Sequence, residues 1–205
     1  MKTSFCSKDQ RPLLIVLSGL SGAGKDAVLA RLKKSRYPLE HITTVTTRLP
    51  RASERDNMDY HFISKEKFQE MIEGDELLEW AKVYDNWYGV PRKPVKQALD
   101  KGQDIVIKVD VQGAATIKTI LPQAIFIFVT PPSIEELILR LKRRHTESPA
   151  ELALRTKTVE EELKQLPMFD YVVFNRQNEI GRAVQDIEAI ISAEKCRVTP
   201  REIAL

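Results

Sequence analysis

The sequence has few of the features that mark secreted, membrane or metal-stabilised proteins. It holds only two cysteines, Cys6 and Cys196, and no Cys/His spacing typical of a metal site. Two isolated thiols fit a reducing compartment. No apolar run approaches the ~20 residues of a membrane-spanning helix, and the first twelve residues lack the apolar centre of a secretory signal. We therefore expect a cytoplasmic protein that has no membrane partner.

A large excess of charge of one sign is also absent. The chain has 32 Lys and Arg residues against 29 Asp and Glu residues, which gives a net charge of +3. This mild balance does not argue for nucleic acid as a partner, although it suits an anionic small molecule. The 205 residues, of which 42% are hydrophobic, are enough for one ordinary α/β domain with a buried core.

Short apolar runs alternate with helical patterns along most of the chain. The runs at 13–17, 105–111, 124–129 and 171–174 are typical of buried parallel strands, and the segments 134–144 and 182–195 have helical periodicity. This alternation predicts a doubly wound, mostly parallel sheet flanked by helices. Two stretches differ. Residues 43–95 predict a small inserted β-rich subdomain, and the very polar residues 140–155 predict a helical flap.

The first apolar run ends in GLSGAGKD, residues 19–26, which nearly matches a phosphate-binding loop. Gly19, Gly24 and Lys25 occupy the expected places between a strand and a helix. Glycines let several backbone N–H groups point at one anion, and the helix N-terminus adds partial positive charge. We therefore expect Lys25 and the amides of this loop to bind the phosphates of a nucleotide.

The residue after the lysine departs from the loop pattern, which has Ser or Thr there to contact Mg²⁺. This chain has Asp26 instead. A carboxylate can also bind Mg²⁺, but it places a negative charge beside a polyphosphate. Asp26 is therefore predicted either as a metal ligand or as a residue that only favours the helix N-terminus.

A second set of polar residues fits a phosphorylated purine. Arg48 and Arg51 flank a proline, and Tyr60 follows, which is chemistry suited to a phosphate monoester. Glu79 lies in an apolar setting, LLEWAKVY, where a carboxylate needs a partner. Guanine offers two adjacent N–H donors that a carboxylate matches. Convergent polar groups near a phosphate loop favour a substrate site over isolated surface charges.

With these residues in view, the sequence closely resembles guanylate kinases, and the resemblance covers nearly the whole chain in the family's order. The matching stretches are SGLSGAGK, TTRLPR, DYHF, LLEWAKVYDNWYG, VDVQGA, FVTPPSIEEL and RLKRRHTES. The resemblance implies an α/β fold with a P-loop NTPase-type core and a five-stranded sheet, a GMP-binding subdomain at about 43–95, and a lid at about 140–155. It also implies ATP-dependent phosphorylation of GMP or dGMP, with Mg²⁺, in a monomer or a homodimer.

The resemblance further implies a role for individual positions. The GMP phosphate would be held by Arg48, Arg51, Tyr60 and Tyr88. The guanine would be read by Thr44, Glu79 and Asp110. ATP would be held by Ser21, Gly22, Ala23, Gly24, Lys25, Asp26 and Asn175. The transferred phosphoryl group would be stabilised by Lys25, Arg48, Arg140, Arg144 and Arg155.

Four positions depart from the family pattern. Besides Asp26, Val90 replaces a hydroxyl residue, Lys108 replaces an acid, and Asn175-Arg176-Gln177 replaces an acidic sequence. Lys108 and Asp110 are two apart on a predicted strand, so they project to the same face. We expect the phosphate loop to lie beside this strand end. The hypothesis is that Asp26 and Lys108 form an ion pair, or that Lys108 partly replaces the charge of the metal.

Two other functions fit parts of the sequence. One is a non-catalytic guanylate-kinase-like module that binds GMP, and the other is a P-loop kinase for a ribosyl bisphosphate. The loop lysine and the flap arginines argue against the first, because such modules usually lose them. Thr44, Glu79 and Tyr88 favour a guanine nucleotide over the second.

Overall fold

The fold is built on one five-stranded parallel sheet. The computed structural model describes residues 11–35, 37–51, 54–83, 85–143 and 158–205. Its strands lie in the order β2, β7, β1, β8, β9, with the bounds Glu40–Ile42, Ile105–Lys108, Leu14–Gly19, Ile125–Thr130 and Tyr171–Phe174. Every neighbouring pair is parallel. The predicted α/β fold with a mostly parallel sheet is therefore confirmed.

Two details of the sheet differ from the sequence prediction. The edge strand β2 was missed, because only Ile42 of its three residues is buried and the segment has no apolar run. Strand β7 ends at Lys108, earlier than the apolar pattern indicates. Asp110 begins helix α4 (Val111–Ile120), and its carboxylate accepts a hydrogen bond from the N–H of Gly113. This N-cap bond satisfies one of the backbone N–H groups that the first turn of a helix leaves unpaired.

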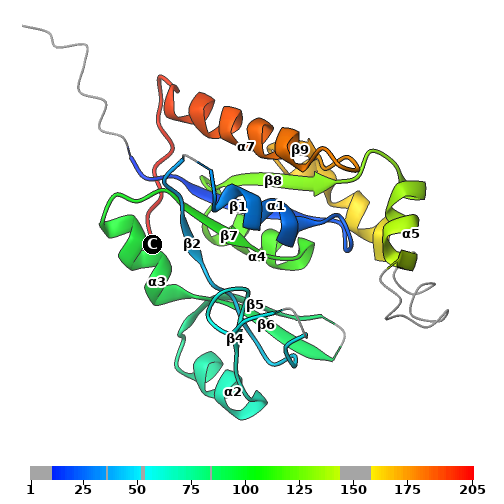
Figure 1. The fold of residues 1–205 in the computed structure, drawn as a ribbon. Coiled ribbons are helices and arrows are strands. Elements are labelled where there is room, and N and C mark those ends of the chain that lie inside the picture. The colour runs from blue at the N-terminus through cyan, green and yellow to red at the C-terminus, as the bar shows by residue number, and fades with distance from the viewer. Residues whose placement is uncertain (1–10, 36, 52–53, 84, 144–157) are drawn as a thin grey trace, which may run out of the picture.

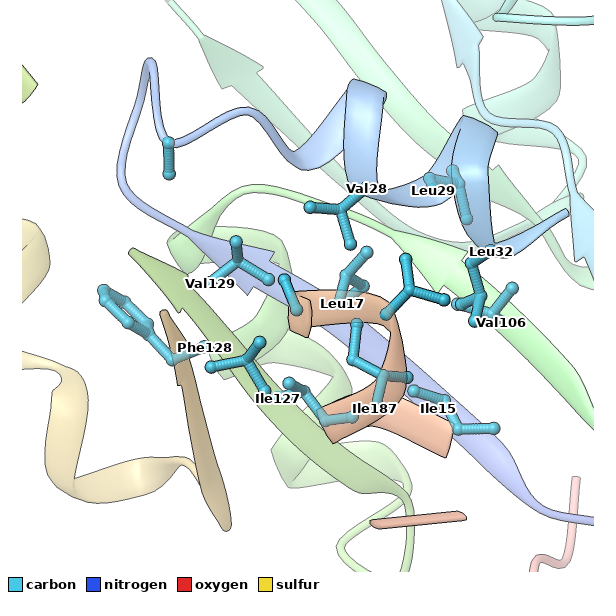
Figure 2. Packing of buried hydrophobic residues seen from close by; sticks show 14 of the residues in the cluster. Ile15, Leu17, Val28, Leu29, Leu32, Val106, Ile127, Phe128, Val129 and Ile187 are labelled. Atoms are coloured by element: carbon cyan, nitrogen blue, oxygen red, sulfur yellow. The ribbon is translucent and has the colours of Figure 1, made fainter. Parts of the chain in front are cut away.

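Helices cover both faces of this sheet (Figure 1). Helices α1 (Lys25–Leu32) and α7 (Ile180–Lys195) pack on one face, and α3 (Arg92–Asp100) and α4 pack on the other. Successive side chains of β1 point to opposite faces of the sheet. Ile15 and Leu17 face α1 and α7, and Leu14 and Val16 belong to the core under α3 and α4. Figure 2 shows Val28 and Leu29 of α1 close to β1 and Ile187. Among the described helices, none has the length and apolarity needed to cross a bilayer.

A second, smaller sheet projects from the first, with α2 at its far side (Figure 1). Its strands lie in the order β4, β3, β6, β5, with the bounds His61–Phe62, Val45–Thr46, Asn86–Pro91 and Leu77–Val83. Helix α2 (Lys65–Glu73) is capped by Ser64, whose hydroxyl oxygen accepts a hydrogen bond from the N–H of Lys67, and it buries Phe68 and Met71. We refer to residues 43–91, which contain this sheet and α2, as the arm.

The remaining elements connect β8 to β9. Helix α5 (Ile134–Arg143) follows β8, residues 158–164 are helical, and the short 3-10 helix η1 (Leu166–Met168) leads into β9. The predicted helix at 134–144 is therefore present through Arg143. Most of the flap expected at 140–155 lies outside the described residues.

The packing of α7 on the sheet gives a direct test of the core. Ile187 is fully buried, whereas Ile134 at the start of α5 is 43% exposed. Ile187→Ala should lower the free energy of unfolding by about 2–4 kcal/mol, because it removes apolar contacts and leaves a cavity. Ile134→Ala, the matched control, should cost well under half as much. Denaturant unfolding measures both, and equal losses would contradict the assigned burial.

Candidate functional site

The phosphate loop connects the end of β1 to the start of α1, at the carboxyl edge of the large sheet. Gly22 and Gly24 have positive φ angles of 87° and 86°, which favour glycine. A Cβ at Gly24 would lie 2.5 Å from Nδ2 of Asn175. That amide nitrogen donates to the carbonyl oxygen of Ala23 at 2.8 Å. Asn175, at the end of β9, therefore fixes the loop, and Gly24 is required for this close approach.

Lys25 is the first residue of α1, and its side chain curls back over the loop. Its Nζ donates to the carbonyl oxygens of Gly19 at 2.7 Å and Leu20 at 3.0 Å. Burial lowers the pKa of Lys25, and the nearby carboxylates of Glu162 and Asp26 oppose that effect. The ammonium group is therefore held at the loop by carbonyl oxygens and by surrounding negative charge.

The structure adds one acidic residue to the loop that the sequence reasoning missed. Oε2 of Glu162 accepts a hydrogen bond from the backbone N–H of Ser21 at 3.1 Å. Burial raises the pKa of Glu162, and the charge of Lys25 partly offsets this. Glu162 is the last of three consecutive glutamates, so no local signal distinguishes it. Its contact demonstrates that this loop amide is directed at an anion.

Arg140 of α5 reaches the same loop. Its guanidinium donates to the carbonyl oxygen of Ala23 at 3.2 Å and to the carbonyl oxygen of Asn175, and it pairs with Glu136 one turn earlier. A cation is thus fixed beside the phosphate loop by three acceptors. The other two predicted flap arginines, Arg144 and Arg155, lie outside the described residues.

Asp26 and Lys108 form an ion pair, as the hypothesis predicted. Oδ1 of Asp26 accepts from Nζ of Lys108. Parallel pairing of β1 with β7 places Leu17 opposite Lys108, so the loop and this lysine meet at one sheet edge. Lys108 is only 7% exposed. Burial lowers its pKa, but the attraction of Asp26 and the contact with Tyr60 outweigh this, so the net pKa lies above the ordinary lysine value.

This pairing bears on how a divalent metal would be held. Mg²⁺ prefers oxygen ligands and usually combines one or two carboxylates with substrate phosphates. The loop has no hydroxyl after Lys25, and one oxygen of Asp26 faces an ammonium group. Within the described ranges, no cluster of three His, Cys, Asp or Glu residues could bind a metal. The residues therefore do not fit a metal held by the protein alone, and the metal-ligand role of Asp26 stays a prediction.

The predicted phosphate ligands of the arm lie together. Nε of Arg48 donates to the hydroxyl of Tyr88 at 3.2 Å, and its guanidinium carbon lies 5.4 Å from the ring centroid of Tyr60. The rings of Tyr60 and Tyr88 are 5.9 Å apart. Glu54, which the sequence reasoning did not single out, accepts from Nη2 of Arg48 at 2.8 Å and from the backbone N–H of Arg51 at 2.8 Å. A carboxylate thus occupies donors suited to phosphate oxygens.

Glu79 is an ionisable group in an apolar, crowded place. It is 4% exposed, and within the described part of the chain its Oε2 has no hydrogen-bond donor. Burial, followed by repulsion from Asp110, raises the pKa of Glu79 to about 8. A Cβ at Gly113 would lie 2.8 Å from this Oε2, so glycine makes room for the carboxylate. Two acids are therefore adjacent at the start of α4, and one of them has an unused acceptor.

Two smaller residues complete this region. Thr44 is 4% exposed, and its hydroxyl donates to the carbonyl oxygen of Lys108 at 3.2 Å. Val90 is 1% exposed and lies opposite Glu79 in the pairing of β5 with β6. A valine side chain offers no hydrogen-bond donor, which agrees with an Oε2 of Glu79 that no described residue satisfies.

Comparison with known proteins decides the family. The model of the family described as guanylate kinase matches residues 11–194. The chain belongs to the guanylate kinase family. A guanylate kinase of Caldanaerobacter subterraneus subsp. tengcongensis is 48% identical over 186 residues, which cover 91% of this chain and 89% of that relative. The rice protein named guanylate kinase 2, chloroplastic/mitochondrial, is 45% identical over 94% of this chain and 68% of its own length.

A solved structure agrees with this assignment. The crystal structure of guanylate kinase from Anaplasma phagocytophilum has a TM-score of 0.76 and 28% identity, and the match covers 94% of this chain and 91% of that one. Membership of the guanylate kinase family makes the chain a nucleoside monophosphate kinase, with nucleotides as its small-molecule substrates. The two alternative functions are not favoured.

The Asp26–Lys108 pair should contribute to stability in a way that depends on both partners. Asp26→Ser leaves a buried ammonium group without its carboxylate and should cost about 1–3 kcal/mol of unfolding free energy. Solvent screening keeps the loss small, because the Asp26 side chain is 60% exposed. Adding Lys108→Met removes that charge and should restore most of the loss. Thermal unfolding of the single and double variants measures this, and simple additivity would contradict the pairing.

Glu79 should make stability depend on pH. Its folded-state pKa of about 8 lies above the ordinary glutamate value of 4.5. The group therefore favours the fold below about pH 4.5, and its contribution is lost as pH rises through about 8. Glu79→Gln does not titrate, so the stability of the variant relative to the parent should increase between pH 5 and about pH 8. Melting temperatures of both proteins across this range test it. A constant difference would mean that Glu79 titrates normally.

Proposed function

We propose that this chain transfers the γ-phosphoryl group of ATP to GMP or dGMP, with the donor bound at the phosphate loop and the acceptor bound against the arm. The observation that carries the proposal is Glu79: a buried carboxylate, with an acceptor oxygen unused by the described residues, lies beside Asp110 at the same sheet edge as the phosphate loop. A buried acceptor oxygen without a hydrogen-bond donor carries a desolvation penalty, which a ligand can relieve by supplying a donor. Guanine supplies two.

The guanine is read by complementary hydrogen bonds. In its ionised form Glu79 accepts from the N1–H and N2–H groups of guanine, Asp110 accepts beside it, and Thr44 offers its hydroxyl to O6. The Thr44 hydroxyl donates to Lys108 before GMP binds, so it must rotate to serve O6. Val90 supplies no hydrogen bond, at a cost of about 0.5–1.5 kcal/mol relative to a hydroxyl residue. Adenine has an acceptor at N1 instead of a donor, so two acceptors would face each other and AMP should bind more weakly than GMP.

The phosphate of GMP binds to Arg48, Arg51, Tyr60 and Tyr88. Arginine forks match phosphate oxygens, and the two phenols add neutral donors. In the substrate-free arm the carboxylate of Glu54 engages Arg48 and the backbone of Arg51. The GMP phosphate therefore meets an arginine that Glu54 has already oriented.

The phosphates of ATP bind to Lys25 and to the loop amides of residues 21–25, with Asn175 supporting the loop. An incoming phosphate competes with Glu162 for the amide of Ser21. Arg140, together with Arg144 and Arg155 of the flap, spreads positive charge around the transferred group. The acceptor oxygen of GMP attacks the γ-phosphorus in line and ADP leaves, so positioning and charge suffice without a covalent intermediate.

Further assignments follow from the same proposal. Mg²⁺ is expected to enter with the ATP phosphate oxygens, since the described protein ligands alone do not suffice. When bound, it would neutralise phosphate charge. The chain works in the cytoplasm as a monomer or a homodimer, and nucleic acids and membranes are not its partners.

Coupled measurement of ADP release tests this function. GMP and dGMP should support turnover, whereas AMP and the reaction without acceptor should give little ADP; each is measured with and without Mg²⁺. Glu79→Gln keeps the shape of the side chain but replaces an acceptor with a donor, so kcat/KM for GMP should fall about 10- to 100-fold, as expected for a lost charged hydrogen bond. No turnover with any nucleoside monophosphate would overturn the proposal.

A further inference from the structure

Lys108 contacts both the phosphate loop and the arm. On one side its Nζ donates to Asp26, in the first turn of α1. On the other side the same nitrogen lies 4.1 Å from the ring centroid of Tyr60 in the arm. The pKa of Tyr60 is raised, chiefly by burial, although Lys108 opposes this. One buried cation thus links a residue at the ATP side to a residue at the GMP side.

The placement of this cation is well determined by its surroundings. Lys108 is the last residue of β7, is 7% exposed, and its carbonyl oxygen accepts from Thr44 at the start of the arm. The carboxylate of Asp26 holds the ammonium group on one side, and an ammonium at this distance is attracted to the face of an aromatic ring. A lysine with three donors and a flexible stem would otherwise sample several positions.

A second lysine of the core contacts the same arm segment. Nζ of Lys33, just after α1, donates to the carbonyl oxygen of Met58 at 3.1 Å. Met58 is 57% exposed, and the contact is a single bond at the surface. Residues 58–60 therefore contact the core through both lysines, and the contact through Lys108 is the buried one.

We propose that Lys108 is a positioning residue for GMP: oriented by Asp26, it holds the ring of Tyr60, and hence the phosphate-binding side of the arm, in place before GMP arrives. The inference rests on the proposed function, because it takes Tyr60 as a ligand of the GMP phosphate. Binding to a prearranged site loses less conformational freedom. Asp26 thereby influences the affinity for GMP without touching it.

If the ion pair between Asp26 and Lys108 served only to stabilise the fold, the expected results would differ. Such a pair would change the stability of the fold and leave the affinity of the folded protein for GMP unaltered. Positioning changes the affinity itself, and it makes the effects of Asp26 and Lys108 non-additive because Asp26 acts only through Lys108. Measuring GMP binding without ATP and in the presence of a chelator excludes any contribution from a metal at Asp26.

The experiment measures the Kd for GMP by titration calorimetry. Four proteins are compared: the unsubstituted full chain, Lys108→Met, Asp26→Ser and the double variant. Lys108→Met should raise the Kd for GMP about 10-fold. Asp26→Ser alone should also raise it, but adding Asp26→Ser to Lys108→Met should change it by less than about twofold. Lys34→Met, which removes an exposed lysine just after α1, is the matched control and should leave the Kd unchanged. Lys108→Arg should recover part of the affinity.

Other results would contradict either the positioning role of Lys108 or the proposed function. Unchanged GMP affinity in folded Lys108→Met, or independent effects of the two substitutions, would overturn the positioning role. If Lys108→Met does not fold, Lys108→Arg and Asp26→Ser supply the comparison, and unchanged affinity in both would count against the proposal. Failure of the parent chain to bind or phosphorylate GMP would instead contradict the proposed function. In steady-state assays, positioning predicts a rise in KM for GMP larger than the fall in kcat.

Discussion

The parallel pairing of β1 with β7 and β8 is the constraint on which the site depends. Parallel strands end at the same edge of a sheet, so whatever follows them meets there. The phosphate loop follows β1, Lys108 ends β7, Asp110 caps α4 just after it, and Asn175 follows β9. These residues lie far apart along the chain, yet the sheet brings them together. The arm is inserted after β2, and its contacts with Lys108 and Lys33 bring Tyr60 to the same edge.

Desolvation gives the site its chemical character. Burial lowers the pKa of Lys25 and raises the pKa of Glu79, because each charged form loses contact with water. Lys108 is as deeply buried, but its charge is kept by Asp26. Three ionisable groups near the end of β1 therefore reach different balances: burial dominates at Lys25 and Glu79, and the attraction of Asp26 dominates at Lys108. Perturbed ionisation of this kind is common at functional sites.

Much of this molecule was accessible from sequence because its signals are local. The glycine loop, the short apolar runs and the helical periodicity of 182–195 each depend on nearby residues, and the corresponding elements are present. The Asp26–Lys108 pair was predictable because the two departures from the family pattern compensate in charge. Strand β2 was missed, since an edge strand with one buried residue has no pattern. Glu54 and Glu162 were missed because no local pattern distinguishes a glutamate that contacts a site residue from one that is simply exposed to solvent.

The sequence by itself determined the fold class, the phosphate loop and the family, because these follow from motifs whose residues are adjacent or regularly spaced. Only the tertiary structure decided how charges at distant positions act on each other: which oxygen of Asp26 meets Lys108, that Lys108 also faces Tyr60, and that carboxylates of Glu54 and Glu162 engage phosphate-type donors. The physical reason is that electrostatic interaction and desolvation depend on distance and burial. Both are set when separate segments pack, and no local pattern encodes them.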